Sequence, residues 1–380
     1  MISDCLKKIN FFKNSYRDWS TNRKLVIIES DDWGSIRMPS SEVFEALLKK
    51  GYPVDLRPFE KFDSIATNKD LDHLFSLLSR FKDVNGRHPV ITANIITANP
   101  DFVGIKKRNF SEYTFEPFTE TLKTYSNVSF ETWQQGINQQ LFFPQLHGRE
   151  HLNVFSWLKS LEDANSEERE VFEYGLMGIP LKKNPNAGNV HQIAFNLDFN
   201  QKSTLEFVSG SITDAQDIFY KSFGYQAKSF ISPVYTWDSK IEYFLKKVGV
   251  EAMQGGRVQL LPLSKKGIKH YTGEISSKSG MLYLVRNAFF EPSTVIDYNK
   301  RSQVLHELKK QTELIFQLKR PLVISMHRLN FVGRIFEINR NVNLELLENY
   351  LKWLLSKYSD IEFMTTVELL ESIQNENCHP

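Results

Sequence analysis

The sequence has little cysteine and no long apolar segment. Its two cysteines, Cys5 and Cys378, stand near opposite ends of the 380 residues, without CxxC or CxxH spacing. This excludes a disulfide framework and a thiolate zinc site. No run approaches the roughly 20 apolar residues that span a bilayer. Lysines interrupt the apolar residues near the N-terminus, so no secretory signal is evident and we expect a cytoplasmic location without a transmembrane segment.

An excess of one charge sign is also lacking, as are several enzyme signatures. The chain has 47 basic and 45 acidic residues and a net charge of +2, so it has no basic excess for binding nucleic acid. No GxGxxG or GxxxxGK[ST] follows an apolar run, which leaves a nucleotide-binding fold unsupported. No GxSxG elbow is present, and the cysteines are terminal, so a serine or cysteine nucleophile has little support.

What recurs instead is a short apolar run followed by a helical period. The runs predict strands at 25–28, 89–98, 141–146, 228–232, 250–254, 281–286, 321–326 and 361–364. The helical periods predict helices at 41–50, 71–81, 151–161, 239–249, 302–319, 344–358 and 367–373. The stretch TDAQ reads as a capping box with Thr213 as N-cap, in a helix that ends at Gly224. Alternating strands and helices predict a parallel sheet closed as an α/β barrel, with an open doubly wound sheet as the competitor.

We expect a single domain over residues 1–380 with two additions. Residues 1–23 form an N-terminal arm, in which Leu6, Ile9 and Phe12 pack on the body of the protein rather than on a membrane surface. The stretch from about 162 to 205 fits the alternation poorly, and we interpret it as an insertion or a long decorated loop. The oligomeric state stays open.

Polar residues follow several predicted strands at the point where each one ends. Asp31 and Asp32 follow the first strand, HGREH (147–151) follows the strand at 141–146, and His327 follows PLVISM. In a parallel α/β barrel the carboxyl ends of the strands meet at one mouth, where active sites are built. Residues about 120 to 300 positions apart are thereby expected to lie close together.

Three of these side chains form a candidate metal site. In HGREH, His147 and His151 stand at i and i+4, a spacing that puts both imidazoles on one side of a helix or of a loop entering one. With Asp32 they make a usual ligand set for Zn²⁺, although Co²⁺, Ni²⁺ and Mn²⁺ suit it too. Asp31 is then free to take a proton from water at the metal.

Together these motifs resemble the NodB-homology polysaccharide deacetylases, carbohydrate esterase family 4, over most of the chain. In that family the first strand-end aspartate is the base, and the second binds metal with the two spaced histidines. A late histidine protonates the leaving amine. The resemblance implies a distorted (β/α)7 barrel, Asp31 and His327 as catalytic residues, and Asp32, His147 and His151 as metal ligands.

The sequence departs from the family pattern in two motifs. Ile231 stands where the third motif carries an arginine that holds the catalytic aspartate. We expect Arg286 to replace it and to pair with Asp31, with Arg149 as the other candidate. The fourth motif, in which an aspartate orients the catalytic histidine, has no clear equivalent near EAMQGGR.

Further residues near the expected site are candidates for binding or supporting the substrate. They are Trp33, Asn94, Pro233, Tyr235 and Trp237. Aromatic faces stack on sugar rings but also fill cores. The amide of Asn94 suits sugar hydroxyls, with turn formation as its alternative. The backbone N–H of Tyr235 is a candidate oxyanion donor.

The sequence therefore predicts a metal-dependent deacetylase that acts on an acetylated amino-sugar glycan or sugar. The acyl group is N-acetyl, with O-acetyl as the alternative. Two rival functions remain open. One is a metal-assisted glycosidase on a related barrel, which needs two carboxylates flanking the scissile bond. The other is a catalytically inactive glycan-binding homologue.

Overall fold

The computed structural model describes residues 15–185 and 188–378 and is built around a nine-stranded sheet. All neighbouring strands in this sheet run parallel. The strands are β1 (Lys24–Trp33), β2 (Ile91–Ile96), β5 (Phe142–Gly148), β6 (Ser229–Ile231), β7 (Ala252–Gly255), β10 (Leu282–Val285), β11 (Ala288–Phe289), β12 (Leu322–His327) and β13 (Ile361–Met364). Such strands are covered on both faces, which is why they appear in the sequence as continuous apolar runs.

The two ends of this sheet meet in one bent segment. The strand order is β10-β7-β6-β5-β2-β1-β12-β11, and β10 and β11 are separated in the chain only by Arg286 and Asn287. The Arg286 N–H donates to Gly255 O at the end of β7 (2.9 Å), whereas the Asn287 N–H donates to Val323 O in β12 (3.1 Å). When β10 and β11 are counted as one bent strand, and β13 is set aside as an extra partner of β1, seven strands form the wall of a distorted (β/α)7 barrel. The open doubly wound alternative is wrong.

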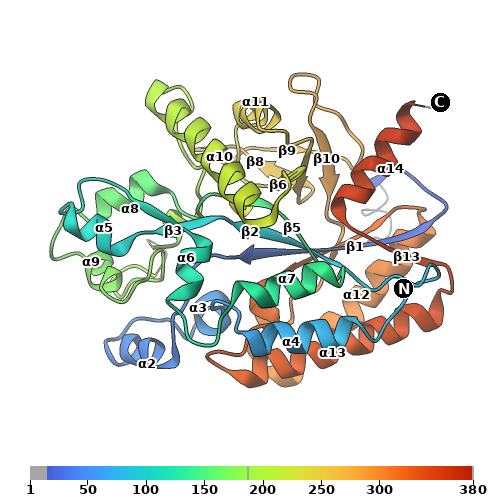
Figure 1. The fold of residues 1–380 in the computed structure, drawn as a ribbon, viewed down its shortest axis with the longest axis horizontal. Helices are drawn as coiled ribbons and strands as arrows, with labels where there is room; N and C mark the ends of the chain where they lie inside the picture. The colour runs from blue at the N-terminus through green and yellow to red at the C-terminus, as the bar shows by residue number, and fades with distance from the viewer. Residues whose placement is uncertain (1–14, 186–187, 379–380) are drawn as a thin grey trace.

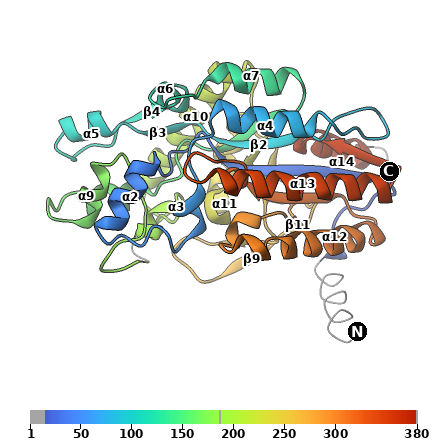
Figure 2. The same ribbon diagram turned by 90° about the horizontal axis from the view of Figure 1, so that it is seen from below.

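Long helices cover the outside of this barrel. They are α4 (Asn68–Leu78), α7 (Phe130–Asn138), α10 (Lys202–Phe223), α11 (Ser239–Lys247), α12 (Ser302–Gln317), α13 (Glu337–Lys357) and α14 (Thr366–Cys378). Figure 1 shows α10 and α11 on one side of β1 and α4, α7 and α13 on the other. Figure 2 shows α12 beside α13.

Short elements gather where the strands end. The other helices are α2 (Ser41–Lys49), α3 (Pro58–Phe62), α5 (Phe102–Lys107), α6 (Phe118–Lys123), α8 (Val154–Ser160) and α9 (Glu167–Phe172). The 3₁₀ turns are η1 (Gly188–Gln192), η2 (Pro233–Tyr235), η3 (Pro292–Thr294), η4 (Tyr298–Lys300) and η5 (Arg328–Asn330). Two small antiparallel sheets pair β3 (Ala98–Pro100) with β4 (Phe115–Pro117) and β8 (Val258–Leu260) with β9 (Gly267–Lys269). In Figure 1, α5, α8 and α9 lie beyond the arrowhead of β1.

Two predicted helix starts are wrong. Helix α10 begins at Lys202, so Thr213 lies inside it and its hydroxyl donates to Ser209 O (3.0 Å) instead of capping. Buried Val208, on a turn before the TDAQ stretch, extends the packed face backwards. Helix α13 begins at Glu337, earlier than predicted. The apolar pattern did not indicate its first turns, because they bury polar side chains such as Asn339 in place of the apolar residues expected of a core helix. The stretch predicted as an insertion contains α9, η1 and the start of α10.

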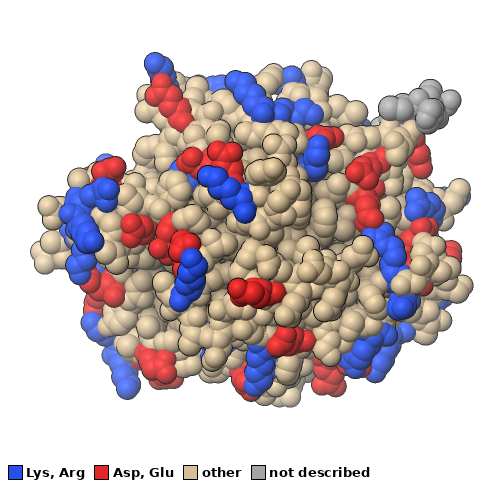
Figure 3. All heavy atoms as spheres, in the orientation of Figure 1, with Lys and Arg blue, Asp and Glu red and all other residues tan. Residues whose placement is uncertain are grey.

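The described end of the N-terminal arm packs on the barrel, where the Trp19 N–H donates to Thr272 O (2.7 Å). The predicted packing of Leu6, Ile9 and Phe12 concerns residues outside the described ones. Among the helices that the structure describes, none combines the length and the apolarity needed to cross a bilayer. On the face drawn in Figure 3, basic and acidic side chains are interspersed, so that face carries no extended basic surface.

Candidate metal centre

The two adjacent aspartates at the end of β1 converge because the strand bends between them. The register with β2 shifts between Ser30 and Trp33, and Asp32 has a φ of +71°. A left-handed backbone is costly for a residue other than glycine and marks a segment that the surrounding structure holds in place. Without this bend, consecutive side chains of an extended strand would point to opposite sides. With it, Asp31 and Asp32 both line the same cavity.

Asp32 lies against the two predicted histidine ligands. The Nε2 atoms of His147 and His151 are 3.4 and 3.7 Å from Asp32 Oδ1. One potential ligand atom from each of the three residues lies within 4.8 Å of the others, and all three residues are buried. The i, i+4 spacing was compatible with a helix, but the two histidines do not lie on one. His147 is in β5, and Gly148 bends the chain with a φ of +113° before His151. The predicted triad is therefore assembled by a strand end and the loop after it.

The protonation of these three groups fits a divalent cation. The Nδ1 atom of His147 is 2.9 Å from Ile231 O; a carbonyl only accepts, so Nδ1 carries a proton, and in the neutral tautomer Nε2 has the lone pair that a metal ligand needs. Burial lowers the pKa of His151 to about 3, so its ring is neutral. Burial would raise the pKa of Asp32, but the Arg37 guanidinium holds it well below its usual range. Asp32 Oδ1 is buried without a hydrogen-bond partner, as expected of an oxygen that serves a cation.

Asp31 sits beside this triad and is held by other groups. Arg286 binds it bidentately, with Nη1–Oδ2 and Nη2–Oδ1 distances of 2.6 and 2.7 Å, and Asn94 Nδ2 donates to Oδ1 (2.8 Å). Burial would raise the pKa of Asp31, but Arg286, with the cationic His327, holds it below its usual range. Arg286 thus stands where the sequence analysis expected the replacement guanidinium. It reaches Asp31 because the bend between β10 and β11 lies at the closure of the barrel.

Arg286 has a second buried partner that the sequence analysis missed. Its Nε donates to Glu29 Oε2 (2.6 Å), while the Thr366 hydroxyl donates to Glu29 Oε1 (2.8 Å). Burial raises the pKa of Glu29 in spite of the guanidinium. Glu29 and Asp31 are two apart on β1 and therefore point to the same side, a period-2 signal that was present in ESDD.

His327 has the acid partner for which the sequence gave no motif. Its Nδ1 is 2.6 Å from Glu291 Oε1, and Asn330 Nδ2 donates to Glu291 Oε2 (2.8 Å). Burial would lower the pKa of His327, but Glu291, with Asp31 and Asp32, raises it to about 10. Its Nε2 is 3.8 Å from Asp31 Oδ2. The imidazole is therefore a cation at neutral pH. It lines the cavity, and Glu291 fixes its orientation through Nδ1.

A buried series of charges extends from the other side of Asp32. Arg37 Nη2 donates to Asp32 Oδ2 (3.1 Å), and its Nε is 3.4 Å from Asp63, which also binds Arg328. No spacing rule links these positions, so the sequence could not have indicated them. They leave Oδ1 as the one Asp32 oxygen that faces the histidines.

The two predicted tryptophans belong to the core. Trp33 packs edge-on against Trp133 and Phe142, with ring centres 6.0 and 4.9 Å apart. Trp237 stacks on His270 at 5.8 Å. Both tryptophans are almost fully buried and neither lines the cavity, so the predicted contact with a substrate is wrong.

Two more candidates have different partners from those predicted. Arg149 pairs with Glu150 and Asp214, at 2.6 Å each, away from Asp31. Asn94 is buried beneath the cavity, where it supports Asp31 instead of facing a sugar.

Tyr235 lines the cavity, but its backbone is engaged. Its N–H donates to Ser232 O (2.9 Å), so the predicted role of this N–H as an oxyanion donor is wrong. Its hydroxyl is 3.5 Å from Nη1 of Arg286. Pro233 is buried at the first position of η2, where its fixed φ suits the turn.

These groups open into one cavity of about 270 Å³ at the mouth of the barrel. Its lining residues are Asp31, Asp32, Arg37, Phe59, His147, His151, Gln192, Ser232, Val234, Tyr235 and His327. A buried metal-ligand triad, an ionised carboxylate and a cationic imidazole therefore share one small space. A divalent cation held by the triad would act there as a Lewis acid, beside one group that can accept a proton and one that can donate a proton.

Comparison with known proteins gives likeness in fold only. No protein-family model matches the chain, and no curated protein matches it in sequence. Solved structures similar to it include a protein assigned as a polysaccharide deacetylase from Mycobacterium smegmatis (7% identity, TM-score 0.44, 94% of this chain and 93% of that one). Another is the 4-alpha-glucanotransferase from Thermococcus litoralis (12%, 0.47, 92% and 40%). A third is a CE4 family pseudoenzyme from Bacillus anthracis (8%, 0.37, 92% and 66%).

This chain spans well under half of the glucanotransferase. Each of these three likenesses concerns the fold alone, so the functions considered above stay open. The choice depends on the geometry of the site.

Titration with Zn²⁺ is expected to raise the melting temperature of the metal-stripped protein, because a ligand of the folded state alone stabilises it by about 2.7 kcal/mol at 100 times its Kd. His147→Ala removes one of the three candidate ligands and should abolish most of this shift. Differential scanning calorimetry measures both. His73→Ala, at an exposed histidine on α4, is the control and should keep the full shift. An equal zinc response in the two variants would contradict the site.

Proposed function

We propose that this protein is a metal-dependent hydrolase that removes acetyl groups from acetylated amino sugars. N-acetyl groups are the proposed target, with O-acetyl groups as the alternative. The observation that carries the proposal is the placement of Asp31 and His327 on one cavity with the triad of Asp32, His147 and His151. Zn²⁺ is the proposed ion, and Co²⁺, Ni²⁺ and Mn²⁺ suit the same ligands.

A divalent cation held by the triad would supply Lewis acidity toward the amide carbonyl and toward water. Asp31, ionised and fixed by Arg286 and Asn94, accepts the proton that the attacking water loses. His327, charged and oriented by Glu291, donates a proton to the departing amine. The donor and the acceptor are 3.8 Å apart, so both reach the same reacting group.

The replacement of two family motif residues supports an active enzyme over an inactive homologue. Arg286 comes from the β10–β11 bend and binds the candidate base bidentately, although Ile231 occupies the position of the family arginine. Glu291 provides an acid partner for His327 from outside the fourth motif. Loss of the motif residues therefore does not leave either catalytic group without its partner.

The same electrostatics disfavour a glycosidase. A glycosidase needs a carboxylic acid with a raised pKa beside a second carboxylate. The carboxylates that line the cavity are Asp31 and Asp32, and the pKa of each lies below its usual range. Neither one holds a proton at neutral pH.

Product analysis tests the proposal directly. Zinc-loaded protein and its chelator-stripped form are incubated with N-acetylated and O-acetylated hexosamines and their oligomers, and acetate and new reducing ends are measured. We expect metal-dependent acetate without new reducing ends. New reducing ends would indicate the glycosidase, and binding of sugar by loaded protein without either product would indicate the inactive homologue.

A further inference from the structure

The cavity is walled by segments that lie outside the barrel strands. Phe59 comes from α3, Gln192 from η1 of the predicted insertion, and Val234 and Tyr235 from η2. Together they stand around the metal-ligand triad and His327. The size and stiffness of these walls determine what can reach the triad.

The Gln192 wall is tied to the metal centre itself. Its Oε1 accepts from Arg37 Nη1 (2.5 Å), and the same guanidinium donates to Asp32. Its Nε2 donates to Gly178 O (2.8 Å), within the insertion. Both ends of the Gln192 amide are thus bonded, and the side chain has a fixed position over the cavity.

The segment that carries Gln192 is anchored to α8 on its inner side. His191 Nδ1 lies 2.8 Å from Ser156 Oγ, and His191 O accepts from the Asn153 N–H (2.6 Å). Asn153 Nδ2 also donates to Asn196 O (3.1 Å). These bonds cross between the loop after β5, which supplies His151, and the insertion.

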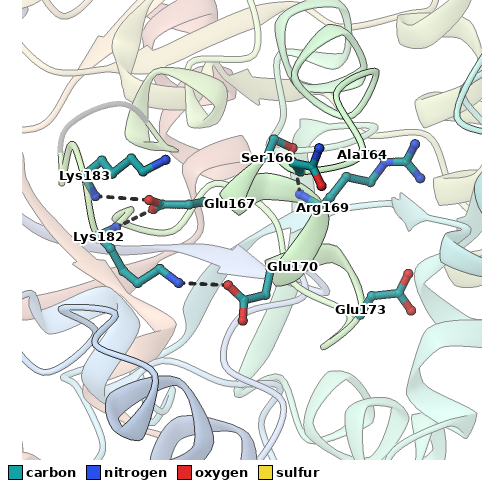
Figure 4. Close-up of a pocket in the computed structure, with 9 residues that line it drawn as sticks. Ala164, Ser166, Glu167, Arg169, Glu170, Glu173, Lys182 and Lys183 are labelled. Atoms are coloured by element: carbon teal, nitrogen blue, oxygen red, sulfur yellow. Dashed lines mark hydrogen bonds and ion pairs between the residues drawn. The ribbon is translucent and has the colours of Figure 1, made fainter.

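The outer side of the insertion is anchored as well. Figure 4 shows Lys182 and Lys183 facing Glu167 and Glu170 of α9, with the Lys182 N–H 2.6 Å from Glu167 and its Nζ 2.9 Å from Glu170. Glu170 also accepts from Lys50 Nζ at the end of α2 (2.6 Å). The lysine–glutamate bonds join two parts of the insertion to each other. The bond to Lys50, together with the bonds of Gln192, His191 and Asn196, ties the described parts of the insertion to the body of the protein.

The other two walls are held in place too. Val234 and Tyr235 have φ values of +54° and +52°, a left-handed backbone that costs energy and recurs at ligand clamps. The Ser232 hydroxyl donates to Thr236 O (2.5 Å) and closes this turn. Phe59 packs edge-on against the His327 ring at 5.2 Å.

The enclosed space is small for a polymer-binding site. Pockets for drug-sized ligands usually hold about 300–1,000 Å³, whereas this cavity holds about 270 Å³. A residue inside a glycan chain needs room for both of its neighbours, which is more space than this cavity provides between the Gln192 and η2 walls. Tyr235 and Phe59 provide aromatic surface for a single ring.

We propose that the site takes one acetylated sugar unit, either free or at the end of a chain, and excludes units within a chain. This inference rests on the proposed deacetylase function and specifies its substrate class. The anchored insertion is its structural basis, and Gln192 is its specificity-determining residue.

The test uses zinc-loaded protein with three free N-acetylhexosamines, the gluco, galacto and manno isomers, and the hexamer of N-acetylglucosamine. Acetate is quantified, and mass spectrometry locates each lost acetyl group in the hexamer. We expect release from free sugars and from a terminal unit only. Release from internal units would overturn this inference and leave the proposed function intact. Release from none of these probes, together with none from the O-acetylated hexosamines of the product analysis, would overturn both.

A variant tests the wall itself. Gln192→Ala should raise the rate of acetate release at internal units, relative to the rate with the free sugar, by about tenfold. A change of a few atoms in the size of a pocket changes discrimination between substrates by about 10-fold or more. Val190→Ala, at a half-exposed residue of the same 3₁₀ turn outside the cavity, is the matched control and should keep the wild-type ratio. An unchanged ratio in Gln192→Ala protein that melts like the wild type would overturn the role of the wall. Phe59→Ala repeats the test from another wall if Gln192→Ala does not fold.

Discussion

Asp31→Asn protein is expected to bind zinc as the wild type does and to lose acetate release by about 10²–10⁴-fold in kcat, the usual contribution of a general base. Asparagine has nearly the same shape as aspartate but cannot accept the proton from water. The three candidate ligands Asp32, His147 and His151 are untouched. Steady-state kinetics on zinc-loaded protein and calorimetric zinc titration measure the two effects separately.

The control for this variant is Asp72→Asn, at an exposed aspartate on α4 that does not line the cavity. It should keep both zinc binding and rate. Full activity in Asp31→Asn protein would remove Asp31 as the base. Loss of zinc together with loss of rate would show that Asp31 acts on the metal instead.

The strand ends were predictable because the barrel imposes where they meet. Asp32, His147 and His327 follow three apolar runs, and parallel strands bring their carboxyl ends to one mouth whatever the sequence distance. Helical patterns gave the helix positions for a similar reason, since a packed helix face needs apolar residues every three to four positions. Apolar strand runs and helical periods are both patterns between residues near one another in the sequence, and each determines which residues pack together in the fold.

The partners of these groups were harder to foresee. Glu291 and Arg37 reach the site through side chains whose partners lie at no regular spacing from them. Trp33 was misplaced for a different reason. It directly follows Asp32 in the sequence, but the bend that aims Asp32 into the cavity leaves the indole in the core beside Trp133. Nearness in sequence to a functional residue is therefore a poor guide when the backbone bends between them.

The prediction with the largest effect on stability concerns Arg286. Arg286→Met should lower the free energy of unfolding by about 3–5 kcal/mol, because removing one partner of a buried ion pair leaves charge uncompensated. Arg286 is fully buried and binds both Glu29 and Asp31 at 2.6 Å. Urea denaturation measures the loss as a shift of the midpoint.

Arg80→Met is the matched control, because Arg80 also binds a carboxylate bidentately but is half exposed. Its loss should cost less than about 1 kcal/mol, as for other surface pairs. Neutralising the carboxylates as well, in Glu29→Gln/Asp31→Asn/Arg286→Met, should recover most of the stability while acetate release stays lost, because neutral groups no longer need a counterion. Equal costs for Arg286→Met and Arg80→Met would mean that the guanidinium does not hold the carboxylates at the closure of the barrel. Recovery of stability in the triple variant would show that the cost of Arg286→Met comes from the uncompensated buried carboxylates and not from the lost volume of the arginine side chain.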